Sequence, residues 1–250
     1  MKHLLLSGLS TLALATPAFA GPVTDAYAEV LARGLQPGPD GILLFDYAAA
    51  HTNGDHQAIE AFIEEQAQAA PSTMGEAEAL AYWANLYNAV TLDVVLDHYP
   101  LKSIREFGLF NTGPWNRELV SVEGETLSLN DIEHTKMRGQ YPSPYIHYMV
   151  NCASIGCPNL LPELWAADTL EADQKRAARE YINADRGVDF NGRTLSVSKI
   201  YTWYAEDFGT KDDLRAHLAT YADGEKRDAL LAGKPFKGSH YDWDLNAARK

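Results

Sequence analysis

The sequence predicts an α+β fold in a single domain, with helices packed on a mixed or antiparallel sheet. Apolar residues recur at three- and four-residue steps in several segments, which is the spacing of a buried helix face. Short runs of β-branched and aromatic residues, bounded by Gly and Asn, indicate strands between these helices. The 5 Trp, 13 Tyr and 8 Phe residues are sufficient for a substantial core. Because no linker or low-complexity stretch interrupts the pattern, we expect one domain.

The first 20 residues have the pattern of a secretory signal peptide. Lys2 precedes an apolar run from Leu4 to Ala15, and the small-residue ending Ala18-Phe19-Ala20 follows. We therefore expect a mature chain that starts near Gly21 and is periplasmic or secreted. No later stretch approaches the roughly 20 apolar residues of a membrane span, so no integral membrane segment is predicted.

The charge balance limits the partners. The chain has 21 basic and 34 acidic residues, a formal net charge of −13. Such a surface repels nucleic acid and anionic lipid, and it favours neutral or cationic ligands such as peptides or amines. The sequence does not identify the substrate, and it implies no cofactor.

Residues 21–72 are predicted to form an N-terminal helical region that precedes the main domain at 73–250. A loop rich in Gly and Pro divides this region, and His51 and His56 are predicted to be surface residues. The predicted elements are a helix at Thr24–Arg33, a short apolar run at Ile42–Tyr47 and a helix from Asp55 to about Ala69.

The longest predicted helix begins the main domain and extends to about His98. Thr73 and Glu76 match a capping box at its start. Asn85 and Asn88 lie beside its apolar stripe, and a buried amide must be hydrogen-bonded. These amides either tie the helix to a neighbouring loop or orient a catalytic side chain.

The rest of the chain alternates short strands and helices. Two segments, Glu123–Ile132 and Asn191–Ile200, share a pattern of a hairpin with a Gly turn, then a helix capped by Asn130 or Ser198. Asn130 with Glu133 fits a capping box. The remaining elements are a helix from Thr169 to Asn183, an aromatic core cluster at Ile200–Tyr204, a helix from Thr210 to Tyr221 and a last strand at Tyr241–Leu245.

The stretch from Tyr145 to Pro158 concentrates polar groups where a predicted strand ends in a tight loop. It contains His147, Asn151 and both cysteines, Cys152 and Cys157. A rigid strand that presents such groups on a loop is typical of a functional site.

Five motifs stand out along the chain, at 82–89, 128–134, 146–158, 198–209 and 241–246. The most specific of them is Asn-Cys-Ala-Ser-x-x-Cys-Pro, which begins at Asn151. Together, over about Ala81 to Asn246, they resemble the DUF547 family, a domain of unknown function. Because the family has no assigned activity, the resemblance implies none.

The sharper functional hypothesis is a thiol hydrolase or acyl transferase. Cys152 would be the nucleophile, because loop N–H groups near it could lower the thiol pKa and hold an oxyanion. His134 is the preferred base, and Glu133 or Asn85 would orient it. His147 is a further candidate: it would project from the opposite face of a regular strand and would meet the thiol only if a bulge intervenes. A papain-like or transglutaminase-like core is an analogy to other thiol enzymes.

Three other hypotheses use the same residues. A secreted binding or scaffolding domain would join Cys152 to Cys157 in a structural disulfide and bury His147. Glu133, His134, His147 and the thiols could instead hold zinc, although their spacing matches no compact ligand motif. The last hypothesis is thiol–disulfide redox exchange, but four residues separate the two cysteines, more than the two of a CxxC loop.

Overall fold

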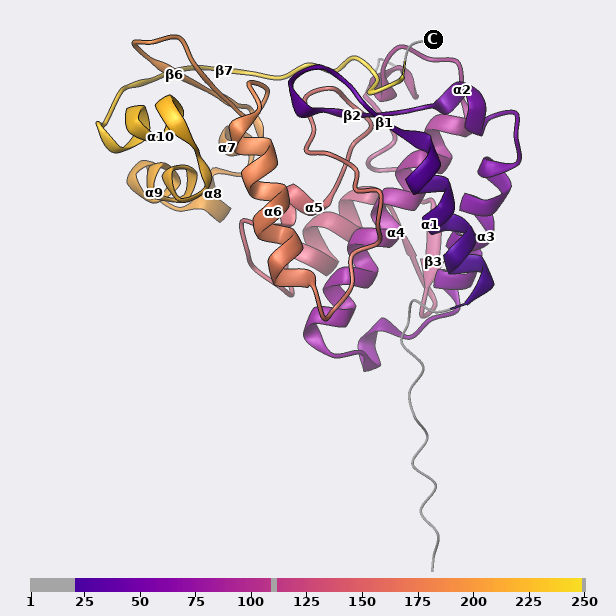
Figure 1. Cartoon of the computed structure of the whole chain (residues 1–250). Helices are drawn as coiled ribbons and strands as arrows, with labels where there is room; N and C mark the ends of the chain where they lie inside the picture. Colours follow the sequence, from indigo (N-terminus) through magenta and orange to yellow (C-terminus); the bar gives the residue numbers. More distant parts are fainter. Residues whose placement is uncertain (1–20, 109–111, 249–250) are drawn as a thin grey trace, which may run out of the picture.

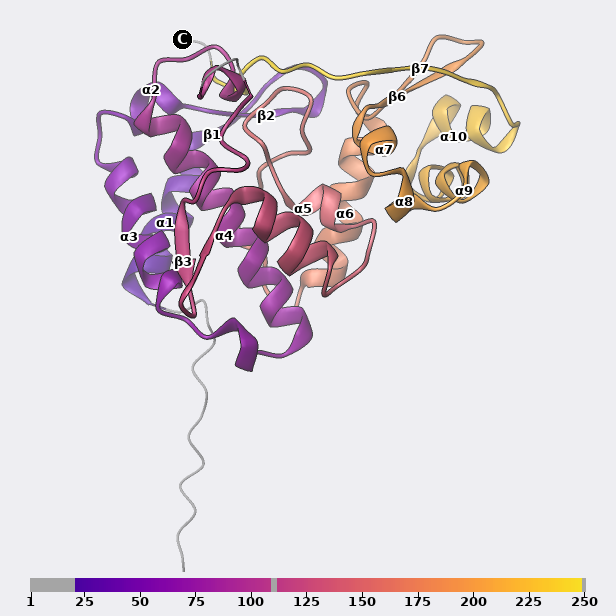
Figure 2. The same cartoon turned by 180° about the vertical axis from the view of Figure 1, so that it is seen from behind.

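Helix α4 (Glu76–Asp97) is the central element of the fold. Every residue from Ala79 to Leu96 except Asp93 is buried, so the helix is covered on all its faces. Figures 1 and 2 show α4 between the N-terminal helices on one side and the later helices on the other. The computed structural model describes residues 21–108 and 112–248, and the predicted signal peptide at 1–20 lies outside them.

The N-terminal elements pack on one face of α4. Tyr27 and Phe62 stack in their core with ring centroids 4.3 Å apart, and β1 pairs antiparallel with β2. The elements on this side are α1 (Pro22–Gly34), β1 (Leu35–Pro37), the 3-10 turn η1 (Pro39–Gly41), β2 (Leu43–Phe45), α2 (Tyr47–Ala50), α3 (Asp55–Ala67) and η2 (Pro71–Thr73).

Several segments that follow α4 in the chain contribute to the cavity described below. A hairpin leads into η5, whose hydrogen bonds follow the wider π-helical pattern. The elements here are η3 (Ile104–Glu106), β3 (Val120–Val122), β4 (Glu125–Leu127), η5 (Asp131–Arg138), α5 (Ile146–Met149) and α6 (Leu170–Asn183).

The C-terminal third forms a small mixed sheet with four helices. Strand β6 pairs antiparallel with β5 and parallel with β7. The tail after β7 then crosses the molecule and returns to the N-terminal hairpin, where Phe45 bridges Ala247 (Figure 1). These elements are β5 (Val188–Phe190), β6 (Leu195–Ser198), α7 (Ile200–Trp203), α8 (Ala205–Phe208), α9 (Lys211–Tyr221), α10 (Gly224–Leu231) and β7 (Phe236–His240).

The predicted fold class is confirmed, because the structure is 52% helix and 12% strand, with small sheets beside the helices. Thr210 and Asp213 form the capping box that starts α9. The capping box predicted at Thr73 is wrong, since α4 begins after Gly75 with no side-chain cap. The division at residue 72 stays a prediction.

Two predicted strands are wrong. The segment predicted as a strand before Asn151 contains the short helix α5. The last strand ends at His240, before the alternating residues predicted to form it. His56 is also not a surface residue: its side chain is 13% exposed and bonds Asp93.

Candidate active site

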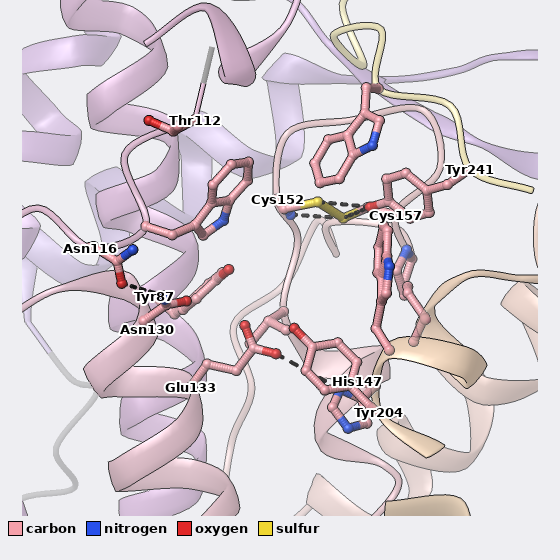
Figure 3. Close-up of a pocket in the computed structure, with 16 residues that line it drawn as sticks. Tyr87, Thr112, Asn116, Asn130, Glu133, His147, Cys152, Cys157, Tyr204 and Tyr241 are labelled. Atoms are coloured by element: carbon pink, nitrogen blue, oxygen red, sulfur yellow. Dashed lines mark hydrogen bonds and ion pairs between the residues drawn. A yellow bond between two sulfur atoms is a disulfide. The ribbon is translucent and has the colours of Figure 1, made fainter. Parts of the chain in front are cut away.

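A cavity of about 320 Å³ lies between α4, η5, the loop at 151–158 (the central loop), α7 and the C-terminal tail (Figure 3). Six of its sixteen lining residues are Trp or Tyr. Of the predicted site residues, Glu133, His147 and Cys152 line it, whereas His134 and Asn85 do not. The lining residues are Tyr87, Thr112, Trp115, Asn116, Asn130, Glu133, His147, Val150, Cys152, Cys157, Pro158, Ile200, Trp203, Tyr204, Tyr241 and Trp243.

The central loop is held in shape by Asn151 and by the tail that covers it. The Asn151 side chain accepts from the Ala153 N–H at 2.8 Å and donates to the Pro158 carbonyl at 2.6 Å. The Gly156 N–H donates to the Asp242 carbonyl at 2.8 Å. A Cβ on Gly156 would lie 2.9 Å from backbone atoms of Asp242, so only glycine permits this approach.

Cys152 and Cys157 form a disulfide across this loop, with Cα atoms 6.2 Å apart. Cys152 is therefore not a free thiol in this structure, and the predicted nucleophile is corrected on this point. The pairing is the one that the binding-domain hypothesis predicted. The Tyr241 hydroxyl lies 2.9 Å from the Cys152 sulfur and 3.1 Å from the Cys157 sulfur, so it packs against the bridge.

His134 does not meet Cys152. Its Nδ1 accepts a hydrogen bond from Arg138 at 2.9 Å, and its ring lies beside Tyr204. Within the described part of the chain, no hydrogen bond joins His134 to the disulfide. The predicted pair of thiol and imidazole base is therefore not formed.

Asn85 and Asn88 tie α4 to neighbouring loops, which is the structural alternative of the two predicted. Asn85 accepts from the Trp165 N–H at 3.0 Å and donates to the Trp165 carbonyl at 2.9 Å. Asn88 accepts from the Asn151 N–H at 2.8 Å and donates to Met149. Asn85 thus orients a loop backbone rather than a base, and Asn88 supports the central loop.

Glu133 enters the cavity because a different pair caps the helix. The Ser128 hydroxyl donates to the Asp131 carboxylate at 2.6 Å and also accepts from the Asp131 N–H at 3.1 Å. This contact lowers the Asp131 pKa. The capping box predicted for Asn130 and Glu133 is therefore wrong, since Ser128 and Asp131 already satisfy the helix start.

His147 lies between two carboxylates. Its Nε2 is 2.6 Å from Asp207, and its Nδ1 is 3.9 Å from Glu133. Figure 3 shows Glu133 and His147 pointing toward each other, beneath the ring of Tyr204. The two stacked rings have centroids 4.1 Å apart. The predicted position on the opposite side from the site is thus wrong, because the segment is helical.

The protonation of this group follows from burial and its partners. Burial lowers the His147 pKa, so the ring is neutral near pH 7. Burial opposes ionisation of Asp207, but hydrogen bonds from Arg138 and His147 lower the Asp207 pKa below its usual range. A neutral His147 that donates from Nε2 to Asp207 has an acceptor at Nδ1. That buried Nδ1 has no hydrogen-bond partner among the described residues.

Sequence reasoning missed most of the aromatic wall. The segment at Ile200–Tyr204 is predicted as core, yet only its first half is buried there, and Trp203 is 47% exposed at the cavity. Tyr241 and Trp243 were assigned to a strand. The signal that could have found them is the clustering of aromatics in the motifs at 198–209 and 241–246.

The predicted zinc ligands do not converge. The cysteine sulfurs are joined in the bridge, and His134 bonds Arg138. Within residues 21–108 and 112–248, a different group has ligand atoms within 4.8 Å of one another, on α3 and α4 outside the cavity. It consists of His56, Glu60, Asp93 and Asp97.

The fold and the site are those of an α+β protein with a cavity lined by Trp and Tyr rings beside a disulfide-bridged loop. Residues 71–182 match the model of a family described as "Protein of unknown function, DUF547". The resemblance seen in the sequence is thereby confirmed over this segment, and the motifs at 198–209 and 241–246 lie beyond it.

Neither the curated proteins nor the solved structures contain a match to this chain. The papain-like or transglutaminase-like core accordingly stays an analogy. Among the described residues, no helix combines the length and the apolar character that a membrane crossing needs.

Proposed function

We propose that this protein binds a small organic molecule in the aromatic cavity and that the disulfide serves to hold the cavity wall. The observation that carries the proposal is a hollow of about 320 Å³ whose walls combine Trp and Tyr rings with a few polar side chains. Ligand pockets commonly start near this volume and combine an apolar lining with few polar groups. Glu133 and His147, at the floor of the cavity, would orient the bound molecule through hydrogen bonds.

The disulfide favours binding over the thiol hydrolase. A disulfide sulfur carries no thiolate, and thiolate is the nucleophile that such chemistry requires. With Cys152 bridged and His134 bonded to Arg138, both partners of the proposed reaction are occupied. The hydrolase would need prior reduction of the bridge and a movement of the histidine.

We place the protein in the periplasm or outside the cell. The first 20 residues have the pattern of a cleaved signal peptide. A disulfide is stable in such oxidising compartments. Expression with and without residues 1–20, followed by fractionation and mass measurement, tests this location.

Thiol labelling separates the two functions. We expect iodoacetamide to leave the unfolded, unreduced protein unmodified, and to add two groups after reduction. Unfolding before labelling ensures that burial of Cys157 does not mimic a disulfide. Labelling of Cys152 in the unreduced protein would contradict the binding proposal and restore the hydrolase.

A cavity-filling variant tests binding itself. Prodan, a neutral fluorescent dye whose emission shifts in apolar surroundings, is the probe. We expect a blue shift with the wild-type protein and at least about a tenfold loss of affinity in Val150→Phe, which fills the cavity. Leu231→Phe, at a residue 68% exposed on α10, is the matched control. Equal binding by Val150→Phe and wild type would overturn the proposal.

A further inference from the structure

The floor of the cavity carries a negative charge that the protein does not balance. Glu133 is 5% exposed, and it is the one carboxylate among the lining residues, which include no Lys or Arg. Its one ion-pair partner among the described residues is His147, at 3.9 Å. Because burial keeps His147 neutral near pH 7, it does not supply the missing positive charge.

Arg138, whose guanidinium carbon lies 5.0 Å from the centroid of the Tyr204 ring, is already paired with other carboxylates. Arg138 bonds the Asp207 carboxylate through Nε and through Nη2 at 3.0 Å, and it also bonds Glu206. Those contacts raise the Arg138 pKa. A buried carboxylate without a cationic partner costs free energy, which a positively charged ligand would recover.

Two polar groups flank Glu133: the Tyr204 hydroxyl, which donates to it, and the His147 ring, which offers an acceptor. The Tyr204 hydroxyl donates to Glu133, and burial raises the Tyr204 pKa so that the hydroxyl stays protonated. On the other side, the unpaired Nδ1 of His147 is an acceptor. A carboxylate and an imidazole nitrogen 3.9 Å apart together favour a group rich in N–H donors.

The walls above this floor suit a cation. Tyr241 lies with its ring centroid 4.6 Å from Trp243 and 4.8 Å from Trp203, and Trp115 lies 5.5 Å from Trp243. Aromatic faces carry negative potential and attract ammonium groups. Arg105 already lies over the Trp243 ring, with 5.4 Å to its centroid. The half-exposed Trp203 offers a further ring at the cavity.

We propose that the ligand of this cavity is an organic ammonium ion, with Glu133 as its counter-ion and the Trp and Tyr rings as its cage. This inference rests on the proposed binding function and adds the charge of the ligand. The net charge of −13 would draw such a cation toward the protein from a distance.

The test compares two probes of nearly equal shape, benzylammonium and benzyl alcohol, by calorimetry at pH 7.5 and moderate salt. We expect benzylammonium to bind at least about tenfold more tightly, since a charge-assisted hydrogen bond is stronger than a neutral one. Glu133→Gln should remove this preference, so that the affinities for benzylammonium and benzyl alcohol differ by less than about twofold. Glu225→Gln, an exposed carboxylate on α10, is the matched control and should keep the preference.

Trp203→Ala gives a second measure that does not depend on the buried carboxylate. Because Trp203 is half-exposed, its loss should not unfold the chain, and we expect benzylammonium to lose about threefold or more in affinity. If benzylammonium and benzyl alcohol bind the wild-type protein with equal affinity, and Val150→Phe weakens the binding of both, the cation inference is overturned and the binding function stands. Absence of binding by both probes and by prodan would overturn both.

Discussion

At the scale of single residues, the position of Glu133 shows why the site is difficult to find from sequence. Two capping patterns overlap in Ser128–Glu133, and both satisfy the same rule. The pair Ser128 and Asp131 forms the cap, which leaves Glu133 in the first turn of a π-helical segment facing the cavity. Such segments are frequent at functional sites. Sequence spacing alone does not decide which acid caps and which is left free.

The sequence identified residues of the cavity correctly but did not identify their roles. Glu133, His147 and Cys152 all line the cavity. Their roles depend on contacts with segments far along the chain, such as Asp207 to His147 over 60 positions. Because no local pattern specifies such a contact, the neutral state of His147 and the partner of Cys152 could not be derived from residue type alone.

A partly buried histidine outside the cavity makes the stability depend on pH. His217 on α9 is surrounded by the rings of Tyr145, Tyr148, Phe208 and Tyr221, and its Nε2 is 2.9 Å from the Tyr148 hydroxyl. Burial lowers the His217 pKa from 6.5 to about 4. The unfolded state therefore binds a proton before the folded state does, and stability falls as pH falls from about 6.5 toward 4.

Because of His217, we expect the free energy of unfolding to fall by about 2 kcal/mol when the pH is lowered from 7.5 to 5. Urea unfolding of wild type and His217→Gln at both values measures it. Other titrating groups, including His147, contribute to both proteins and cancel in the difference. If the two proteins lose the same stability over this range, His217 is not buried as neutral imidazole.

At the scale of elements, long helices were predicted well because their signal is local. Helices α4, α6 and α9 lie within a few residues of the expected ranges, and the apolar spacing that defined them is independent of their neighbours. The segments before Asn151 and after His240 were predicted wrongly as strands. Their alternating aromatic residues suit a strand, but α5 and the irregular tail satisfy their backbone groups through loops and side chains.

Asn85 on α4 gives a direct test of the structural role against the catalytic one. Asn85→Ala leaves the buried N–H and C=O of Trp165 without their partner, so we expect about 2–3 kcal/mol of lost stability. Affinity for prodan should stay within about twofold of wild type, because Asn85 does not line the cavity.

Gln57→Ala, an exposed amide on α3, is the matched control for Asn85→Ala and should change stability by less than about 0.5 kcal/mol. Urea unfolding and dye titration on the same samples give both quantities. Normal stability with lost binding in Asn85→Ala would return Asn85 to the site.

At the scale of the whole molecule, the C-terminal tail connects the C-terminal sheet to the N-terminal hairpin and completes the cavity. Figure 1 shows it running from the C-terminal sheet back to the N-terminal hairpin. Asn246 accepts from the Phe45 N–H at 2.9 Å through its carbonyl and from the Tyr47 hydroxyl at 2.8 Å through its side chain. Contacts between positions about 200 residues apart carry no sequence signal, which is why the tail could be predicted only as a strand.

The course of the tail over the central loop requires a residue without a side chain at position 156. Gly156→Ala places a Cβ 2.9 Å from both the N and the O of Asp242, and backbone atoms cannot move away cheaply. We expect about 1–3 kcal/mol of lost stability. Since Tyr241 and Trp243 flank that contact, prodan affinity should fall at least about threefold.

Gly75→Ala is the matched control, because nothing lies within 4 Å of a Cβ at that position and its φ of −65° suits any residue. Hydrogen exchange adds a local measurement, because the amides of Ile155 and Gly156 donate to the tail. Their protection should fall in Gly156→Ala relative to the amides of α9 and should be unchanged in Gly75→Ala. Unchanged binding and protection in Gly156→Ala would mean that the tail is not a wall of the cavity, and the ligand would then be held by α4, η5 and α7 alone.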